Sequence, residues 1–115
     1  MEFNSDFRHD LKLAQETENA FANILGPNTT IEIKDDLQAS QTGNIFIEFE
    51  SRGNPSGIAT TEADYWTIHI DGIWITIETK HLKDIARFMY KKNGTTNGGD
   101  SNTSKGVLIP IKNLF

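Results

Sequence analysis

Residues 31–36 read IEIKDD and residues 44–50 read NIFIEFE, and apolar and polar residues alternate in both stretches. This alternation is typical of β-strands, because successive side chains of a strand point to opposite faces. We expect the isoleucines to face the core. The polar face of each strand then carries Glu32, Lys34 and Asp36 on the first and Glu48 and Glu50 on the second. If the two strands pair as a hairpin, Glu48 comes within cross-strand reach of Glu32 or Lys34.

Such a hairpin would bring several carboxylates and one lysine together. Carboxylates a few ångströms apart repel one another, and a cation between them removes the repulsion. Oxygen ligands of this kind suit Mg²⁺ or Mn²⁺. One interpretation of the spacing is therefore a metal site among these residues, which include Glu32, Asp36 and Glu48. The alternative is a solvated sheet face whose Glu and Lys residues form weak cross-strand pairs.

Length and composition limit the classes of protein to consider. The 115 residues suit a single domain, 1–115, with one core. No run approaches the roughly 20 apolar residues of a membrane span, and the first residues lack the apolar segment of a signal peptide. We therefore expect a cytoplasmic protein without a membrane partner. The net charge of −5 argues against general coating of nucleic acid, so any contact with DNA must be local.

The remaining periodicities predict helices and strands in alternation, as in an α/β protein. Asp71-Gly72 is a strong signal for a two-residue hairpin. Residues 37–43 fit either the connection of a loose hairpin or a short turn of helix. In order, the expected elements are a helix at 6–25, strands at 31–36 and 44–50, a short helix at 60–65, strands at 65–70 and 73–78, a helix at 81–92, a polar loop at 93–106 and a strand at 107–111.

The run from Ile31 to Trp66, IEIKDDLQASQTGNIFIEFESRGNPSGIATTEADYW, resembles small phage and bacterial proteins of the PD-(D/E)xK nuclease superfamily. The resemblance extends to GGDSNTSKGVLIPI at 98–111. It implies a restriction-endonuclease-like fold, with a mixed β-sheet flanked by helices. It also implies Mg²⁺- or Mn²⁺-dependent hydrolysis of phosphodiester bonds in DNA. If the chain is encoded by a phage, its location would be the host cytoplasm.

Members of the superfamily use an Asp and an acidic-x-Lys triplet to bind metal and activate water, and a Glu from the first helix often joins them. By this resemblance, Glu32-Ile33-Lys34 matches the triplet and Glu18 matches the helix Glu. The Asp usually precedes the triplet, but residues 25–30, LGPNTT, contain no acidic residue. Its role would pass to Asp36 or Glu48.

A second registration of the same pattern uses the same residues in other roles. In it, Asp36 is the isolated acid, Glu48-Phe49-Glu50 is the triplet with Glu in place of Lys, and Lys34 is a displaced lysine. In either registration the resemblance gives Lys34 the task of orienting water or neutralising charge on the phosphate.

The candidate contact to DNA is a basic stripe that begins at Lys80, just before the predicted helix at 81–92, and continues along that helix. The residues expected to contact nucleic acid are Lys80, Lys83, Arg87 and Lys91 on this stripe and Lys105 in the loop before the last strand. A solvated helix face is the alternative. Two functions remain open: a metal-dependent DNA endonuclease, or a non-catalytic module that binds nucleic acid or a protein partner. Within the enzyme class, a structure-specific junction resolvase acting as a homodimer is the second choice.

Overall fold

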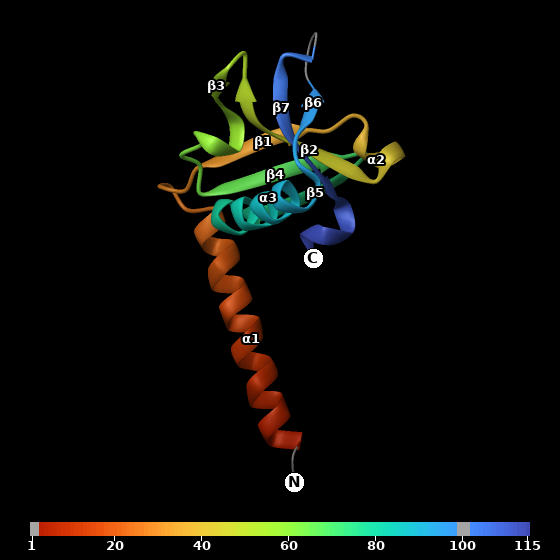
Figure 1. Cartoon of the computed structure of the whole chain (residues 1–115). Helices are drawn as coiled ribbons and strands as arrows, with labels where there is room; N and C mark the ends of the chain where they lie inside the picture. Colours follow the sequence, from red (N-terminus) through yellow and green to blue (C-terminus); the bar gives the residue numbers. More distant parts are fainter. Residues whose placement is uncertain (1–2, 99–101) are drawn as a thin grey trace. The chain divides into compact units, whose positions relative to one another are not determined.

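The computed structural model describes residues 3–98 and 102–115 (Figure 1). The chain divides into two units, one ending at Thr30 and one running from Ile31 to Phe115. The described residues form three α-helices and two β-sheets, so the predicted mixed α/β class is confirmed. Residues 99–101 of the predicted polar loop lie outside the described residues.

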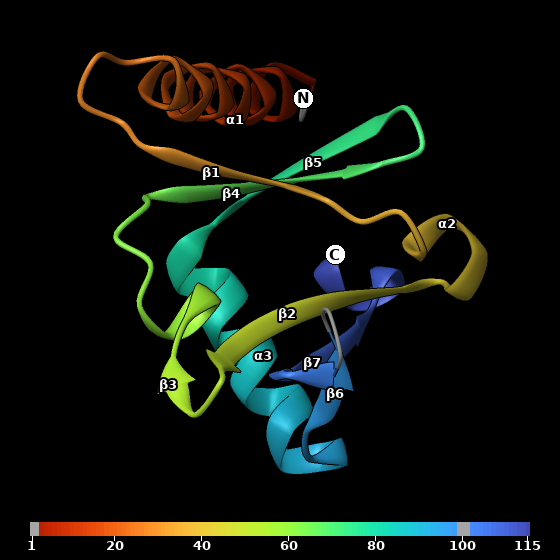
Figure 2. The ribbon, with the colours of Figure 1, turned by 90° about the horizontal axis from the view of Figure 1, so that it is seen from above.

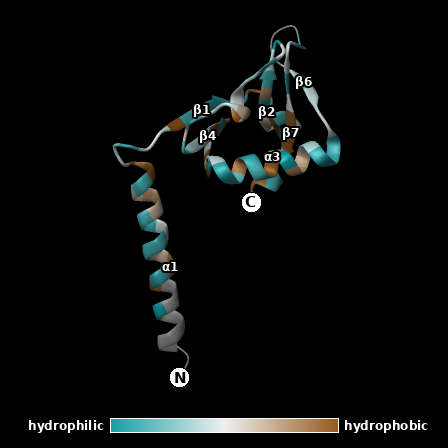
Figure 3. Cartoon of the chain, turned by 60° about the vertical axis from the view of Figure 1, so that its left-hand side comes forward, coloured by the Kyte–Doolittle hydropathy of each residue, from teal (hydrophilic) through white to brown (hydrophobic). Residues whose placement is uncertain are grey.

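The first unit is helix α1, Phe3–Ile24, close to the helix predicted at 6–25. Apolar residues recur along this otherwise hydrophilic helix (Figure 3). Spacings of three and four residues place on one stripe Leu11, Ala14, Phe21 and Leu25. Glu18 belongs to the same stripe, because it follows Ala14 by four residues and precedes Phe21 by three. The helix ends before Gly26, whose N–H donates to the Asn23 carbonyl.

The first sheet of the second unit contains three strands in the order β1-β4-β5, with bounds Ile31–Asp35, Tyr65–Ile70 and Ile73–Glu78. β4 and β5 form the predicted hairpin. Asp71 and Gly72 both have positive φ, 42° and 84°, as a two-residue hairpin turn of this kind requires. β1 pairs with β4 in parallel and places Glu32 opposite Trp66.

The second sheet contains four antiparallel strands in the order β3-β2-β7-β6. Their bounds are Asn54–Pro55 for β3, Asn44–Ser51 for β2, Ser104–Pro110 for β7 and Thr96–Gly98 for β6. β7 begins three residues before the predicted strand at 107–111 and includes Lys105. A bulge between Glu48 and Glu50 shifts the register of β2 against β7.

The predicted hairpin between the first two strands is wrong, since β1 and β2 belong to different sheets. Asp36 explains the separation: its Oδ1 accepts hydrogen bonds from the N–H groups of Gln38 and Ala39, at 3.1 and 3.0 Å. Its Oδ2 accepts from the N–H of Phe46 at 3.1 Å. These bonds turn the chain into the short helix α2, Ala39–Thr42, which lies between β1 and β2 (Figure 2).

Helix α3, Thr79–Asn93, covers the core of the second unit and packs against both sheets (Figure 1). The largest fully buried side chains come from both sheets and from this helix: Trp66, Ile45, Ile47, Ile68, Leu82, Ile109 and Val107. A 3₁₀ turn, η3 at Ile111–Leu114, follows β7. None of the helices within the described ranges has the length and apolar character that crossing a membrane demands.

The helix predicted at 60–65 does not form. A single 3₁₀ turn, η1 at Gly57–Ala59, lies just before it instead. Thr61 accepts a hydrogen bond from the N–H of Ala63 at 3.2 Å, two residues on. A helix cap makes the same bond to its second helical N–H, but no helix begins at Thr61, and the chain proceeds into β4.

Candidate active site and nucleic-acid interface

Glu32 and Lys34 of β1 form an ion pair on the face of the first sheet from which Trp66 of β4 also projects. Lys34 Nζ lies 3.4 Å from Glu32 Oε2 and 5.8 Å from the centroid of the Trp66 ring. Trp66 is buried, whereas the Lys34 side chain is 52% exposed. The acidic-x-Lys triplet therefore rests on a core aromatic residue, with its ammonium group accessible to a ligand.

This arrangement reverses the expected orientation of β1. Ile31 and Ile33, predicted to face the core, are 38% and 60% exposed. Because Glu32 stands opposite Trp66 in the parallel register, the polar side of β1 points to the same side of the sheet as the buried tryptophan. The polar side chains reach solvent because β1 is an edge strand.

Glu48 lies on β2, in the other sheet, and is half-buried. Its Oε2 accepts a hydrogen bond from Ser56 Oγ at 2.8 Å. Gly57, which follows Ser56 in the chain, packs so tightly against Glu48 that a Cβ at position 57 would lie 2.2 Å from the Glu48 carbonyl oxygen. The side chain and the backbone of Glu48 are thus both held by residues 56 and 57.

Residues 56–61, SGIATT, connect the two candidate carboxylates, and we call them the bridging segment. Ser56 at one end holds Glu48 of the second sheet. Thr61 at the other end donates to Glu32 Oε1 of the first sheet at 3.2 Å and accepts from Trp66 Nε1 at 3.3 Å. The sequence predicted no role in the site for these hydroxyl residues. The one indication in the sequence was that both residues lie within the run from Ile31 to Trp66 that carries the family resemblance.

The other acidic candidates have separate surroundings. Asp36 uses both carboxylate oxygens for backbone N–H groups. Glu50 Oε2 lies 3.5 Å from Lys105 Nζ, which places the predicted nucleic-acid contact Lys105 beside a carboxylate. Glu18 belongs to the first unit, where its side chain is exposed.

Within residues 3–98 and 102–115, no three His, Asp or Glu side chains form a group that could hold a metal ion. The expected convergence of Glu32, Asp36 and Glu48 is thus absent from this part of the chain. Mg²⁺, however, is commonly bound by one or two carboxylates together with phosphates of the substrate. Glu32 and Glu48 have the donor chemistry for that mode of binding.

A second polar cluster surrounds His69 at the end of the β4–β5 hairpin. Its Nδ1 lies 2.6 Å from Asp35 Oδ1, and the Gly72 N–H donates to its Nε2 at 3.3 Å. Trp74 stacks on the imidazole with centroids 4.2 Å apart. Both ring nitrogens have a partner, so the cluster fastens the hairpin to β1. This cluster could be predicted only by knowing the pairing of β1 with β4, which places Asp35 opposite His69.

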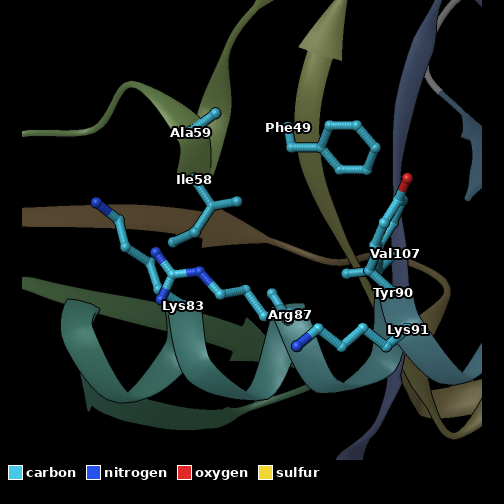
Figure 4. A pocket seen from close by; sticks show the side chains of 9 residues that line it. Phe49, Ile58, Ala59, Lys83, Arg87, Tyr90, Lys91 and Val107 are labelled. Carbon is cyan, nitrogen blue, oxygen red and sulfur yellow. The ribbon is translucent and has the colours of Figure 1, made fainter. Parts of the chain in front are cut away.

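A pocket of about 380 Å³ lies between α3, η1, β2 and β7 (Figure 4). Its apolar lining includes Phe49 and Ile58, and Tyr90 of α3 stands at its rim beside Phe49. Three residues of the predicted basic stripe also line it: Lys83, Arg87 and Lys91. Lys80 does not belong to this lining. The part of the stripe from Lys83 to Lys91 therefore forms the basic wall of an apolar pocket, and no such pocket was predicted from the sequence.

Comparison with known proteins adds no assignment: no family model matches the chain, and no curated protein or solved structure is significantly similar to it.

Proposed function

We propose that the chain is a metal-dependent endonuclease that hydrolyses phosphodiester bonds in DNA. The observation that carries the proposal is the Glu32–Lys34 ion pair, which the bridging segment links to Glu48. Two carboxylates can bind a cation together with a phosphate of the substrate, and a neighbouring lysine can stabilise charge on that phosphate. The restriction-endonuclease-like variant of the fold is part of this proposal.

Each residue of the site has a chemical task in the proposed reaction. Glu32 and Glu48 would hold Mg²⁺ or Mn²⁺, which when bound supplies a Lewis acid and lowers the pKa of coordinated water. Lys34 brings positive charge to the phosphate, where negative charge accumulates in the transition state. Thr61 and Ser56 orient the two carboxylates, as outer-shell partners of metal ligands do.

Cleavage of a DNA panel with Mg²⁺ or Mn²⁺ tests the proposal. The panel comprises linear duplex, single-stranded and branched DNA, because a structure-specific enzyme would cut only some of these. We expect Lys34→Ala to lower the single-turnover rate about 100-fold or more with little loss of DNA affinity, since its charge acts mainly on the transition state. Lys92→Ala, on the exposed side of α3, is the matched control. Equal rates for Lys34→Ala and the wild type would exclude the proposed role of Lys34.

A non-catalytic module that binds nucleic acid is the second candidate. It is favoured by the use of Asp36 for backbone hydrogen bonds, which removes one expected metal ligand. If the wild-type protein binds DNA but cuts no member of the panel with either metal, this second function replaces the first. Preferential cutting of four-way branched DNA would instead support a junction resolvase, and such an enzyme is expected to act as a homodimer.

A further inference from the structure

The pocket beside α3 combines two surfaces that suit different parts of one ligand. Phe49, Ile58 and Val107 provide apolar walls, while Lys83, Arg87 and Lys91 provide positive charge along α3. Figure 4 shows the three cationic side chains extending from the helix on one side, with the Phe49 and Tyr90 rings at the other end. The pocket volume of about 380 Å³ lies within the range of roughly 300–1,000 Å³ found for ligand pockets.

The aromatic part of the pocket can accept a flat ring. Phe49 and Tyr90 meet edge to face, with centroids 5.9 Å apart and planes at 89°. Tyr90 is 51% exposed, so part of its ring surface is not covered by Phe49. Nucleobases stack on exposed aromatic side chains of this kind, and the interaction tolerates any base.

The cationic part of the pocket suits phosphates that flank such a base. Lys83, Arg87 and Lys91 are spaced by four residues, so they follow one line along the helix. Arg87 pairs with Asp84 at 3.2 Å, but both side chains are about 70% exposed, 69% and 74%. An exposed pair of this kind is weak and can exchange for a phosphate. Because the chain carries a net charge of −5, the local cations give this pocket a sign opposite to that of the whole protein.

We propose that this pocket binds an unstacked base of a single-stranded DNA segment, with the neighbouring phosphates on Lys83, Arg87 and Lys91. A base within a duplex is stacked and paired, and extruding it costs a few kcal/mol, so a single-stranded or frayed segment presents a base to the pocket at the lowest cost. The inference deepens the proposed function and rests on the chain acting on DNA, since it names single-stranded or branched DNA as the substrate class.

The bridging segment places this pocket next to the candidate active site. Ile58 and Ala59 line the pocket, and the hydroxyl residues that hold Glu48 and Glu32 flank them in the same segment. A strand that inserts a base beside Ile58 therefore lies along the segment that orients both carboxylates. The pocket would thereby select the DNA region that reaches the active site.

Binding of a fluorescent oligonucleotide, measured by anisotropy in EDTA, tests the inference without cleavage. We expect the wild-type protein to bind single-stranded DNA of about ten nucleotides more tightly than the matching duplex. Tyr90→Ala should weaken single-strand binding roughly 5- to 100-fold, the effect of losing one stacked base. Phe88→Ala removes another exposed aromatic of α3 that does not line this pocket, and it should leave affinity within about twofold.

Three further measurements separate stacking and charge from a general loss of structure. Tyr90→Leu retains apolar bulk and should lose affinity like Tyr90→Ala, whereas Tyr90→Phe retains the ring and should bind normally. Arg87→Gln should reduce the slope of log affinity against log salt by about 0.7, and Lys92→Gln should not change it. Quenching of 2-aminopurine in the oligonucleotide by wild type but not by Tyr90→Leu would support stacking.

The outcomes distinguish this inference from the proposed endonuclease activity. Tight, Tyr90-dependent binding of single strands without any cleavage would retain the inference and remove the enzyme. Cleavage of duplex DNA with no preference for single strands and no effect of Tyr90→Leu would overturn the inference and retain the enzyme. A polyglutamate peptide that displaces the oligonucleotide at equal charge concentration would also overturn it, because the pocket would then recognise only negative charge.

Discussion

Gly57 has no space for a side chain, because it packs directly against Glu48. Its φ is +53°, and a Cβ would collide with the Glu48 carbonyl oxygen at 2.2 Å and contact the Glu48 Cβ at 3.2 Å. The glycine thus permits the bridging segment to lie directly against β2. It also allows Ser56, its neighbour, to reach Glu48.

Gly57→Ala should destabilise the protein by more than the cost of a positive φ alone. That conformational cost is about 1–2 kcal/mol for a residue with a side chain. Gly53→Ala is the matched control, because Gly53 has a φ of +85° but nothing within 4 Å of an added Cβ. In urea denaturation, Gly57→Ala is expected to lose at least about 1 kcal/mol more than Gly53→Ala. Equal losses would show that the bridging segment can move away from Glu48.

At single positions, the sequence predicted common faces correctly but not which face is buried. Alternation places Glu32 and Lys34 on one side of β1, and their ion pair confirms it. Whether that side points to the core depends on the partner strand. Trp66, which lies beside Glu32 in the structure, is 34 residues away in the chain and carries no local signal that would identify it as the neighbour.

At the scale of elements, Asp36 decides how β1 is connected to β2. Its carboxylate accepts two N–H groups at the start of α2 and a third from Phe46 in β2. Carboxylates near a helix start are stabilising because they receive N–H groups that lack partners within the helix. Asp36 therefore fixes the turn that separates the two sheets.

Asp36→Ala should lower the free energy of unfolding by about 2–4 kcal/mol in EDTA, because part-buried N–H groups lose their acceptor. Asp36→Asn should lose less, since one amide oxygen can still accept. Glu62→Gln, at an exposed position, is the control and should have little effect. If Asp36 served only to bind metal, its replacement in EDTA would relieve repulsion and leave stability unchanged or increased, which thermal and urea unfolding would reveal.

Elements that have a local sequence signal were predicted well, whereas strand pairings that depend on residues far apart in the chain were not. The β4–β5 hairpin follows from Asp71-Gly72, and α3 follows from its helical periodicity. The parallel pairing of β1 with β4 needs a connection of 29 residues, from Asp36 to Asp64, that itself contains α2 and two strands of the other sheet. Parallel pairs always require such crossovers, and no short pattern in the sequence marks them.

At the scale of the whole molecule, the second unit depends on contacts between its two sheets. The sheets share α3 and the core, and the bridging segment links the carboxylates that stand on each. Negative charge dominates the chain, yet cations gather on one wall of one pocket. We therefore expect selective binding of DNA to come from the local geometry of this pocket, because the net negative charge opposes nonspecific binding of DNA.

Binding of Mg²⁺ or Mn²⁺ to Glu32 and Glu48 should stabilise the second unit as a whole, because a shared cation would link the two sheets. A ligand that binds only the folded state adds about 2.7 kcal/mol at a concentration 100 times its dissociation constant. We expect millimolar Mn²⁺ to raise the melting temperature of the wild type, and Glu32→Gln or Glu48→Gln to abolish the increase. Asp36→Asn provides the internal comparison: it should melt lower in EDTA but keep the metal-induced increase, because its carboxylate already binds backbone N–H groups. An increase that survives in both Glu variants, or that is lost only in Asp36→Asn, would place the cation elsewhere and contradict the two-carboxylate site.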